Sequence, residues 1–384
     1  MRLLAILSLA LLACGLVESL RHRRRLLALP VRILVNGTRG KSSVTRLVAG
    51  ALREAGWKVV AKTTGSAARV IHEDGSELPL RRPRGARITE QKALARLAAG
   101  RGAKALVVEC MAVRAESQAA MRRHLVRPTI CEITNARVDH VEEMGGTIED
   151  TLAALAESVP EGGLLVTTEP RFADPRYSGA AAKVILAEPS EAGPEVLALF
   201  SYPAFADNVA LALRVAGELG VDRETALAGM AKAEPDIGVL RVFELESAAF
   251  KATVVSAFAA NDLDSTALVW KEAATRVPAG LPLALLYNNR PDREYRIPGF
   301  TALPGRIAKI DLVAVAGRNA AKTARRFARL GLATLPFREG AGPEAMLAAV
   351  GKRIGGPFAL FGVGNFHGAG EELMEYCAAR GSPR

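Results

Sequence analysis

The sequence has few of the residues that build disulfide-rich, metal-clustered or base-stacking proteins. Its four cysteines are scattered through 384 residues without metal-ligand spacing, so we expect reduced thiols in the cytosol. Aromatic residues make up only 5% of the chain and do not alternate with basic residues, which disfavours a surface that stacks nucleic-acid bases. The sequence shows neither a fixed-period repeat nor a low-complexity tail. A chain of this length predicts about two or three globular domains.

Acidic residues are outnumbered by basic ones, and the formal net charge is +11. This excess suits an anionic partner, such as a nucleotide, a nucleic acid, an anionic lipid or an acidic polymer. The net charge alone does not choose among these partners.

The N-terminus carries an apolar segment, residues 3–17, followed by the basic segment Arg21 to Arg25. A helix over residues 3–20 would be about 27 Å long, close to the roughly 30 Å of a bilayer's hydrocarbon core. A cleaved signal peptide is the alternative, and the sequence LLAC ending at Cys14 resembles a lipoprotein cleavage site. Signal peptides carry their positive charge before the apolar run, however, whereas here it follows. The positive-inside rule therefore predicts one uncleaved transmembrane helix with its basic stop over residues 1–25, in the cell membrane, with Arg21 and the domains after it in the cytoplasm.

Beyond Pro30, apolar β-rich runs alternate with helical patterns, which is typical of a parallel sheet covered by helices. Helices are predicted over Ser42 to Ala55 and Ala206 to Leu219, and a second cycle of alternation begins near Phe250. We predict an α/β fold with a larger domain over residues 30–245 and a smaller Rossmann-like domain over residues 246–384. The predicted strands are RILVN, KVVAKT, ALVVEC, PTICEIT, GLLVTT and KVILAE in the first domain and FKATVVSAF, LPLALLYNN, DLVAVAG and PFALFGVGN in the second.

A glycine-rich loop, GTRGKS, joins the first predicted strand to the first predicted helix. The common phosphate-loop pattern G-x-x-x-x-G-K-[ST] is not met, because Val35 stands where its first glycine would be. The shorter loop can still turn tightly at its glycines and place phosphate at a helix N-terminus. Lys41 can reach the terminal phosphates and Ser42 can bind Mg²⁺. We predict that ATP, with Mg²⁺ or Mn²⁺, binds Gly37, Thr38, Arg39, Gly40, Lys41, Ser42 and Ser43.

The short form G-T-x-G-K-[ST] resembles the loop of Mur-type amide ligases and folylpolyglutamate synthases, and VVECMA and ITNARVDHVEEMGGTIED extend the similarity. The resemblance implies a phosphate-loop domain of the Mur-ligase type. It also implies that Glu109, at a strand end, holds Mg²⁺ on the phosphates and that His140 lies at a second metal site. The catalytic residues implied are Lys41, Glu109 and His140, and the metal ligands are Ser42, Glu109 and His140.

Three further segments resemble nucleotide- and substrate-binding segments of the same family. FADNVALALRVAGELGV implies that Asn208 lies near the adenine, and VLRVFEL implies that Arg241 contacts phosphate. SAFAANDLDST resembles the segment that opens the family's C-terminal domain, which implies substrate contacts by Asn261 and Asp262.

Nearly the whole chain, anchor included, resembles the ligase subunits of poly-γ-glutamate synthases, the CapB/PgsB type. The most specific motifs are NGTRGKSSVTR, VVECMAV, TNARVDHVEEMG, AFAANDLDST, YNNRPDR and GVGNFHGAGE. The resemblance implies an ATP-dependent ligase that joins glutamate into γ-linked polyglutamate through an acyl phosphate, for a capsule or exopolymer. Implied partners are glutamate, the growing polymer, membrane proteins of a capsule synthesis and export complex, and further copies of the chain in a homo-oligomer. Nucleic acid is not an expected partner.

Arginines in the segments LRRPRGARITEQ and YNNRPDR suit a polyanionic substrate, because guanidinium groups bind carboxylates bidentately. A solvated basic loop is the alternative for the first segment. The predicted substrate-binding residues are Thr64, Arg82, Arg84, Arg87, Asn261, Asp262, Arg290 and Arg293.

The sequence departs from the family at two positions. A carbamylated lysine is usual some fifteen residues after the histidine, but no lysine occurs between His140 and Lys183, and Leu155 stands near that place. We therefore expect a weaker second metal site, or one built with Glu157, and activity that does not depend on bicarbonate. Leu263 replaces a proline that is common after the asparagine-aspartate pair, so we expect a departure in the local shape of the loop and not in the fold.

Other functions stay open at this point. One is a Mur-type ligase with another acceptor, such as a cofactor tail or a cyanophycin-like polymer. A membrane-tethered phosphate-loop ATPase that regulates capsule assembly is a second, disfavoured because Tyr376 is the only tyrosine near the C-terminus. A nucleic-acid-binding ATPase is suggested by charge alone.

Overall fold

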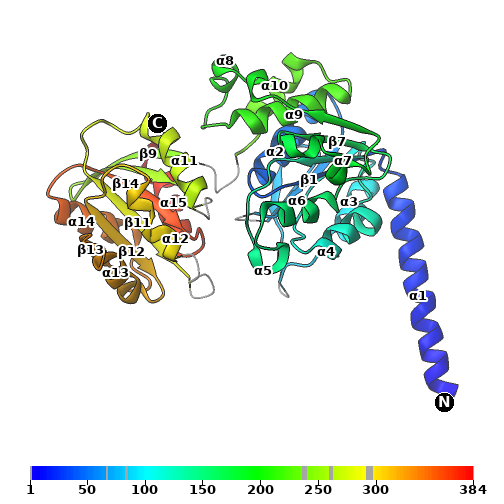
Figure 1. Ribbon diagram of the computed structural model, residues 1–384, viewed down its shortest axis with the longest axis horizontal. Coiled ribbons are helices and arrows are strands. Elements are labelled where there is room, and N and C mark those ends of the chain that lie inside the picture. Colours follow the sequence, from blue (N-terminus) through cyan, green and yellow to red (C-terminus); the bar gives the residue numbers. More distant parts are fainter. Residues whose placement is uncertain are drawn as a thin grey trace. The chain divides into compact units, whose positions relative to one another are not determined.

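The computed structural model describes residues 2–65, 68–82, 85–235, 240–258, 263–290 and 297–383. The chain divides into two compact units, Met1–Asp236 and Ile237–Arg384 (Figure 1).

The first unit begins with a long helix, α1 (Arg2–Leu27), which projects away from the rest of the unit (Figure 1). The segment Leu3–Leu27 has a mean hydropathy of 2.3 in its most apolar window, none of which is buried, and it is long enough to cross a membrane. The last turns of α1 differ, because His22 and Leu26 are buried against the unit. Helix α1 is therefore a candidate membrane span whose C-terminal end is packed onto the protein.

An eight-stranded sheet forms the centre of the first unit, in the order β4-β3-β2-β5-β1-β6-β7-β8. The strands are β1 (Val31–Asn36), β2 (Val59–Thr63), β3 (Arg69–Ile71), β4 (Glu77–Pro79), β5 (Ala105–Glu109), β6 (Ile130–Ile133), β7 (Leu164–Thr167) and β8 (Lys183–Leu186). All six strands predicted for this domain are present and pair in parallel, whereas β3 and β4 form an antiparallel edge. The central strands place their carboxyl ends at one edge of the sheet, which is where α/β proteins bind ligands.

Helices cover both faces of this sheet. Leu34, Leu106 and Cys131 face α3, the π-helical turn η1 and α6, while α2 and α9 pack on the opposite face and α10 packs against α2. The helical segments are α2 (Lys41–Glu54), α3 (Glu90–Gly100), α4 (Ala115–Ala120), η1 (Met121–Leu125), α5 (Val141–Met144), α6 (Ile148–Ala156), η2 (Pro170–Ala173), α7 (Pro175–Ser178), η3 (Pro189–Glu191), α8 (Pro194–Leu197), α9 (Ala206–Glu218) and α10 (Arg223–Lys232). The two helices predicted from sequence correspond to α2 and α9.

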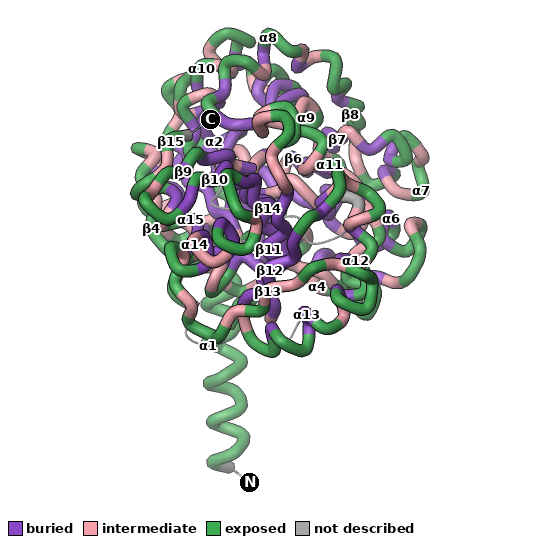
Figure 2. The backbone as a smooth tube through the Cα atoms, turned by 90° about the vertical axis from the view of Figure 1, so that its left-hand side faces the viewer, coloured by how far each residue is buried: buried purple, intermediate pink, exposed green. Residues whose placement is uncertain are grey.

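The second unit contains a seven-stranded sheet in the order β13-β12-β11-β14-β10-β9-β15. Its strands are β9 (Arg241–Glu246), β10 (Lys251–Ser256), β11 (Leu283–Asn289), β12 (Leu312–Gly317), β13 (Thr334–Pro336), β14 (Phe358–Gly364) and β15 (Ser382–Pro383). Its helical segments are α11 (Leu263–Ala274), α12 (Ile297–Thr301), η5 (Leu303–Gly305), α13 (Ala320–Ala328), α14 (Pro343–Ile354) and α15 (Ala369–Arg380). The strands β10, β11, β12 and β14 are buried between two hydrophobic clusters (Figure 2).

The sequence-based boundary between residues 245 and 246 falls inside β9 and leaves residues 241–245 in the first domain, which was wrong. Strand β9 pairs antiparallel with β10 and with β15, so it belongs to the second sheet. A tight turn makes this pairing possible, since the Ser247 N–H donates to the Phe250 carbonyl at 2.8 Å. The predicted α/β class, with two successive sheet domains after an apolar helix, is confirmed.

Candidate functional site

The glycine loop lies between the end of β1 and the start of α2, and both of its glycines are required by geometry. Gly37 has φ 121° and Gly40 has φ 87°, conformations that side chains disfavour. A Cβ at Gly37 would lie 2.2 Å from Thr134 Oγ1, and one at Gly40 would lie 2.5 Å from Asn208 Oδ1. The fold therefore places Asn208 of α9, a predicted ATP-binding residue, directly against the loop.

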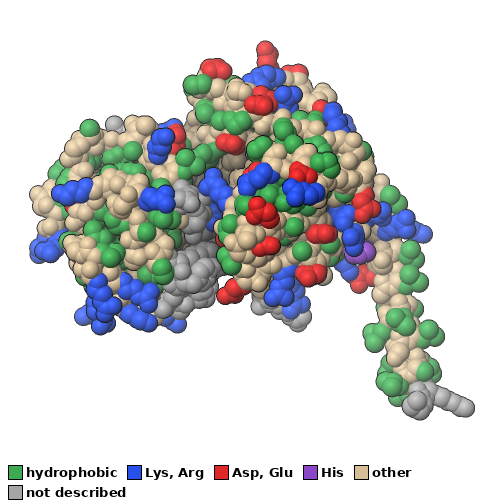
Figure 3. All heavy atoms as spheres, viewed as in Figure 1, with side chains coloured by type: hydrophobic (Ala, Val, Ile, Leu, Met, Phe, Trp, Pro, Cys, Tyr) green, Lys and Arg blue, Asp and Glu red, His purple; other side chains and the backbone are tan. Residues whose placement is uncertain are grey.

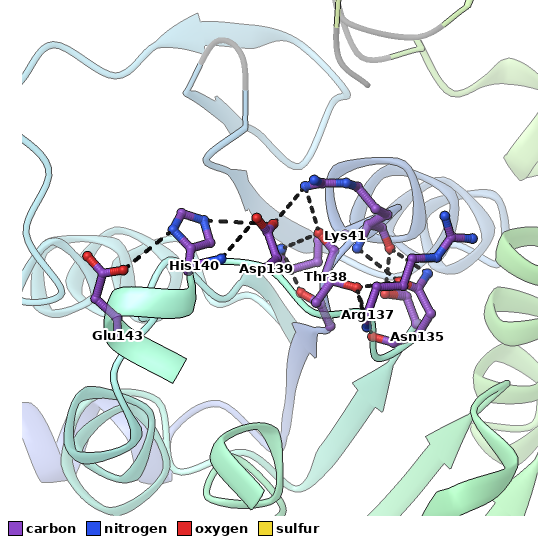
Figure 4. Close-up of polar contacts among 10 residues, drawn as sticks. Thr38, Lys41, Asn135, Arg137, Asp139, His140 and Glu143 are labelled. Atoms are coloured by element: carbon purple, nitrogen blue, oxygen red, sulfur yellow. Dashed lines mark hydrogen bonds and ion pairs between the residues drawn. The ribbon is translucent and has the colours of Figure 1, made fainter. Parts of the chain in front are cut away.

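The segment that follows β6 holds the loop in position (Figure 4). The Thr38 hydroxyl donates to Asn135 Oδ1 at 2.7 Å and accepts from the Arg137 N–H at 3.1 Å. Asn135 also bonds both backbone groups of Arg39, accepting from its N–H at 3.1 Å and donating to its carbonyl at 3.0 Å. The Thr38 side chain thus acts within the protein to fix the shape of the loop, and Asn135 is a positioning residue that our predicted site set omitted.

The Lys41 side chain turns back over the loop. Its Nζ donates to the carbonyl of Gly37 at 2.7 Å and to that of Thr38 at 3.3 Å. Burial lowers the pKa of Lys41 below its usual value, while the nearby Glu109 carboxylate opposes this shift. A lysine held by two neutral carbonyls can transfer its hydrogen bonds to a phosphate, since a charged acceptor binds more strongly.

Glu109 ends β5 next to the loop and is only 2% exposed. Its Oε2 accepts from Ser42 Oγ at 2.8 Å and from the backbone N–H of Thr64 at 2.6 Å. Three predicted site residues from separate segments are therefore in direct contact. A hydroxyl and a carboxylate are oxygen ligands that suit Mg²⁺, which takes one or two protein oxygens and completes its shell with phosphate and water. Ser42 and Glu109 fit such an ion.

His140 belongs to a neighbouring cluster, where it adopts a left-handed conformation with φ 49° before α5 (Figure 4). Its ring nitrogens lie 3.9 Å from Asp139 Oδ2 and 4.0 Å from Glu143 Oε2. Asp139 also pairs with Arg39 Nη1 at 3.0 Å, which connects this cluster to the glycine loop. Within the residues that the structure describes, no set of three or more His, Cys, Asp and Glu side chains is arranged to hold a metal ion.

A charged network extends from Thr64 towards α3. Arg82 donates to Thr64 Oγ1 at 2.9 Å and binds Glu90 bidentately at 2.8 and 3.0 Å. Glu90 also lies 3.2 Å from Nζ of Lys62, which is buried. Burial alone would raise the pKa of Glu90, but the bonds from Arg82 and Lys62 hold it below its usual value. The predicted substrate residue Arg82 is therefore joined to Glu109 through Thr64, and Lys62 and Glu90 were not foreseen.

Four further predicted site residues lie within the part of the chain that the structure describes. Arg87 is exposed, and its backbone N–H donates to Glu90 Oε1 at 3.2 Å. Ser43 is half-buried in α2, and Arg241 and Arg290 are half-buried in the second unit, at the start of β9 and after β11. Arg84, Asn261, Asp262 and Arg293 lie outside the described residues.

Structural contacts engage both Leu155, which stands near the expected place of the modified lysine, and Glu157, the residue considered for the second metal site. Leu155 is 1% exposed and packs in a hydrophobic cluster with Met144 and Leu152. The Glu157 carboxylate lies 3.6 Å from Arg122 Nη2, and its carbonyl accepts from Arg122 Nε at 2.9 Å. Leu155 is therefore a core residue, and Glu157 is engaged by Arg122.

Both units match known family models. Residues 35–182 match the Mur ligase middle domain, and residues 242–380 match the poly-gamma-glutamate synthase CapB C-terminal domain. The chain is 37% identical to "PGA synthase CapB" of Bacillus subtilis (strain 168) over 385 residues, covering 98% of this chain and 97% of that protein. It is 34% identical to "Capsule biosynthesis protein CapB" of Bacillus anthracis over 382 residues, covering 97% and 82%.

Solved structures share the fold at lower sequence identity. FolC of E. coli in complex with DHPP and ADP has a TM-score of 0.68 at 19% identity, covering 93% of this chain and 92% of that one. The bifunctional folylpolyglutamate synthase/dihydrofolate synthase of Yersinia pestis CO92, complexed with AMPPNP and Mn ion, has a TM-score of 0.68 at 16% identity, covering 94% and 92%. The predicted similarity of fold to folylpolyglutamate synthases is confirmed.

Proposed function

Because the chain belongs to the CapB family of Mur-type ligases, ATP-dependent enzymes that form amide bonds, we propose that it joins glutamate into γ-linked polyglutamate for a capsule or exopolymer. The observation that carries the proposal is the contact of Ser42 with Glu109 beside the glycine loop. This contact occurs in a chain that is 34–37% identical to two CapB proteins over almost the full length of the chain.

The proposed chemistry activates a carboxylate by phosphorylation. An oxygen of the γ-carboxylate attacks the γ-phosphorus of ATP, ADP leaves, and an acyl phosphate forms. The amine of the next glutamate then attacks the acyl carbon and loses a proton, and phosphate leaves with the former carboxylate oxygen. The products are an amide, ADP and phosphate, because the loop and Glu109 suit γ-phosphoryl transfer.

The residues of the loop supply positioning and charge. Lys41 moves its hydrogen bonds from the Gly37 and Thr38 carbonyls to the terminal phosphates and neutralises charge that develops there. Ser42 and Glu109 would hold Mg²⁺, which would supply further charge neutralisation on the phosphate oxygens. His140, beside Asp139 and Glu143, is proposed to hold a weaker second ion.

The glutamate substrate is proposed to bind on the side of Thr64 and Arg82. A guanidinium group binds carboxylates bidentately, as Arg82 does with Glu90. Eight further residues stay predictions, because no interaction described above links them to ATP or substrate. They are Ser43, Arg84, Arg87, Arg241, Asn261, Asp262, Arg290 and Arg293.

The proposed setting is the inner face of the cell membrane, with α1 as a single-pass anchor and both catalytic domains in the cytoplasm. The support is the order of apolar and basic segments in α1. Membrane proteins of capsule synthesis and further copies of the chain are the proposed partners.

The test is incubation of membranes that contain the protein with ATP, Mg²⁺ and labelled glutamate. We expect γ-linked labelled polymer together with ADP and phosphate. Release of AMP would contradict the mechanism, and label on a different acceptor would favour another Mur-type ligase. Hydrolysis of ATP without incorporation of glutamate would favour a regulatory ATPase.

A further inference from the structure

A groove of about 650 Å³ lies between α1 and α3. On one side it is lined by Cys14, Val17, Arg21 and Arg25 of α1. These residues are spaced by three or four positions, so they share one face of the helix. In Figure 3, Lys and Arg side chains gather where α1 joins the rest of the first unit, and hydrophobic side chains lie along the projecting part of α1.

Docking of the C-terminal turns of α1 fixes the shape of the groove. His22 Nε2 lies 3.0 Å from the Leu125 carbonyl, and Leu26 packs in a hydrophobic cluster with Leu94 of α3. Nearer the N-terminus, Glu18 pairs with Lys92 of α3 at 2.6 Å. The two walls are thus held together at several points, so the groove is built before any ligand binds.

The charge of the groove changes along its length. Cys14 and Val17 are apolar, whereas the other part is lined by Glu18 and by four basic residues, Arg21, Arg25, Lys92 and Arg96. Among the described residues, only Lys92 of these four has an acidic ion-pair partner, and that partner is Glu18. Three arginines therefore face a cavity with an apolar extension.

We propose that this groove binds an anionic phospholipid. Its phosphate headgroup lies among Arg21, Arg25 and Arg96, and its acyl chains extend along Cys14 and Val17. This gradient matches the boundary between headgroups and acyl chains at the cytoplasmic face of a bilayer. A soluble acidic polymer could use the arginines but not the apolar part. The inference rests on the proposed insertion of α1 into the membrane.

The test uses the full-length chain in nanodiscs of mixed phosphatidylglycerol and phosphatidylcholine, with retained lipid identified by native mass spectrometry. Arg21→Gln/Arg25→Gln removes two charges from the groove. Arg23→Gln/Arg24→Gln is the matched control, since it removes two charges from the same turns of α1 at exposed positions that do not line the groove. Arg96→Gln probes the α3 wall.

We expect the preference of the retained lipid for phosphatidylglycerol to fall at least tenfold in the groove variant and about fivefold in Arg96→Gln, because each of these arginines lines the groove beside the proposed headgroup and a basic residue so placed contributes about fivefold. The control should lower this preference less than the groove variant does, because Arg23 and Arg24 do not line the groove. Equal losses in the two double variants would show diffuse attraction and overturn the proposal, and so would displacement of the lipid by soluble γ-glutamate oligomers. Failure to enter nanodiscs would overturn both anchor and groove. None of these readouts needs ATP or turnover, so they are independent of the ligase test.

Discussion

At the scale of single residues, the contacts of Glu109 and His140 predict which of the two contributes more to activity. Glu109 contacts Ser42 and is proposed to hold the primary ion, whereas His140 lies in the neighbouring acidic cluster. We predict that Glu109→Ala lowers kcat more than His140→Ala, and that Lys41→Ala abolishes turnover. The loss in Glu109→Ala should correspond to about 2.7–4 kcal/mol, by comparison with single donors in other preorganised sites. Titration of Mg²⁺ against initial rate measures it, and a larger loss in His140→Ala would reverse the assignment.

Glu90 provides a prediction about pH. The pKa of its carboxyl is held below the usual value in the folded protein, so its contribution to stability is present above about pH 4.3, the unfolded value. That contribution is lost as pH falls through the lower folded value. Glu90→Gln should lower the free energy of unfolding at neutral pH by about 1–3 kcal/mol, because it leaves Lys62 without its charged partner. Denaturant unfolding at pH 7 and below pH 4 should show this difference shrinking in acid, and a constant difference would contradict the account.

Local sequence identified only part of the site. The Gly37 to Ser42 loop has a recognisable pattern, and Glu109 stands at the end of an apolar run. Asn135 belongs to the TNARVDHVEEMG motif, but local sequence does not connect it to the loop, because its bonds to Thr38 and Arg39 join positions almost a hundred residues apart. Lys62 and Glu90 were missed because a charged residue in a strand and one at a helix start carry no sign that they will pair.

Gly40 provides a prediction at the scale of the loop and its helices. Gly40→Ala places a methyl group against Asn208 and forces φ 87° on alanine. Gly56→Ala is the matched control, since Gly56 has φ 78° and open space around it. Both variants should lose about 1–2 kcal/mol from backbone strain, but only Gly40→Ala should also lose ATP binding. Calorimetric titration with ATP and thermal unfolding separate the effects, and equal ATP affinity in both variants would refute the role of this contact.

The secondary-structure elements show where sequence patterns are informative. Buried parallel strands read as continuous apolar runs, and all ten predicted strands are present. The edge strands β4 and β13, and β3 beside β4, have three residues each, too few for any periodicity to show. Most of strand β9 was assigned to the wrong domain because the boundary was placed near Phe250, where the second cycle of alternation begins, whereas β9 precedes that point and pairs with β10 across a turn.

Helix α1 provides a prediction at the scale of the whole molecule. Its C-terminal turns contribute Leu26 to the core, followed by Leu29, while its N-terminal part is exposed. A chain that begins at Arg21 should leave the membrane fraction and keep its melting temperature. A chain that begins at Val31 should lose several kcal/mol of stability, since deletion of a single buried leucine side chain costs about 2–5 kcal/mol. Fractionation and thermal unfolding measure both effects, and a soluble wild type would refute the anchor.

The central claim is that the whole molecule forms amides through an acyl phosphate. The most direct measurement uses glutamate labelled with ¹⁸O in its γ-carboxylate, supplied with ATP and Mg²⁺ to the full-length protein in membranes. The account predicts one ¹⁸O in the inorganic phosphate for each γ-amide bond formed, with ADP as the nucleotide product. Label in AMP, or phosphate released without ¹⁸O while polymer accumulates, would contradict it.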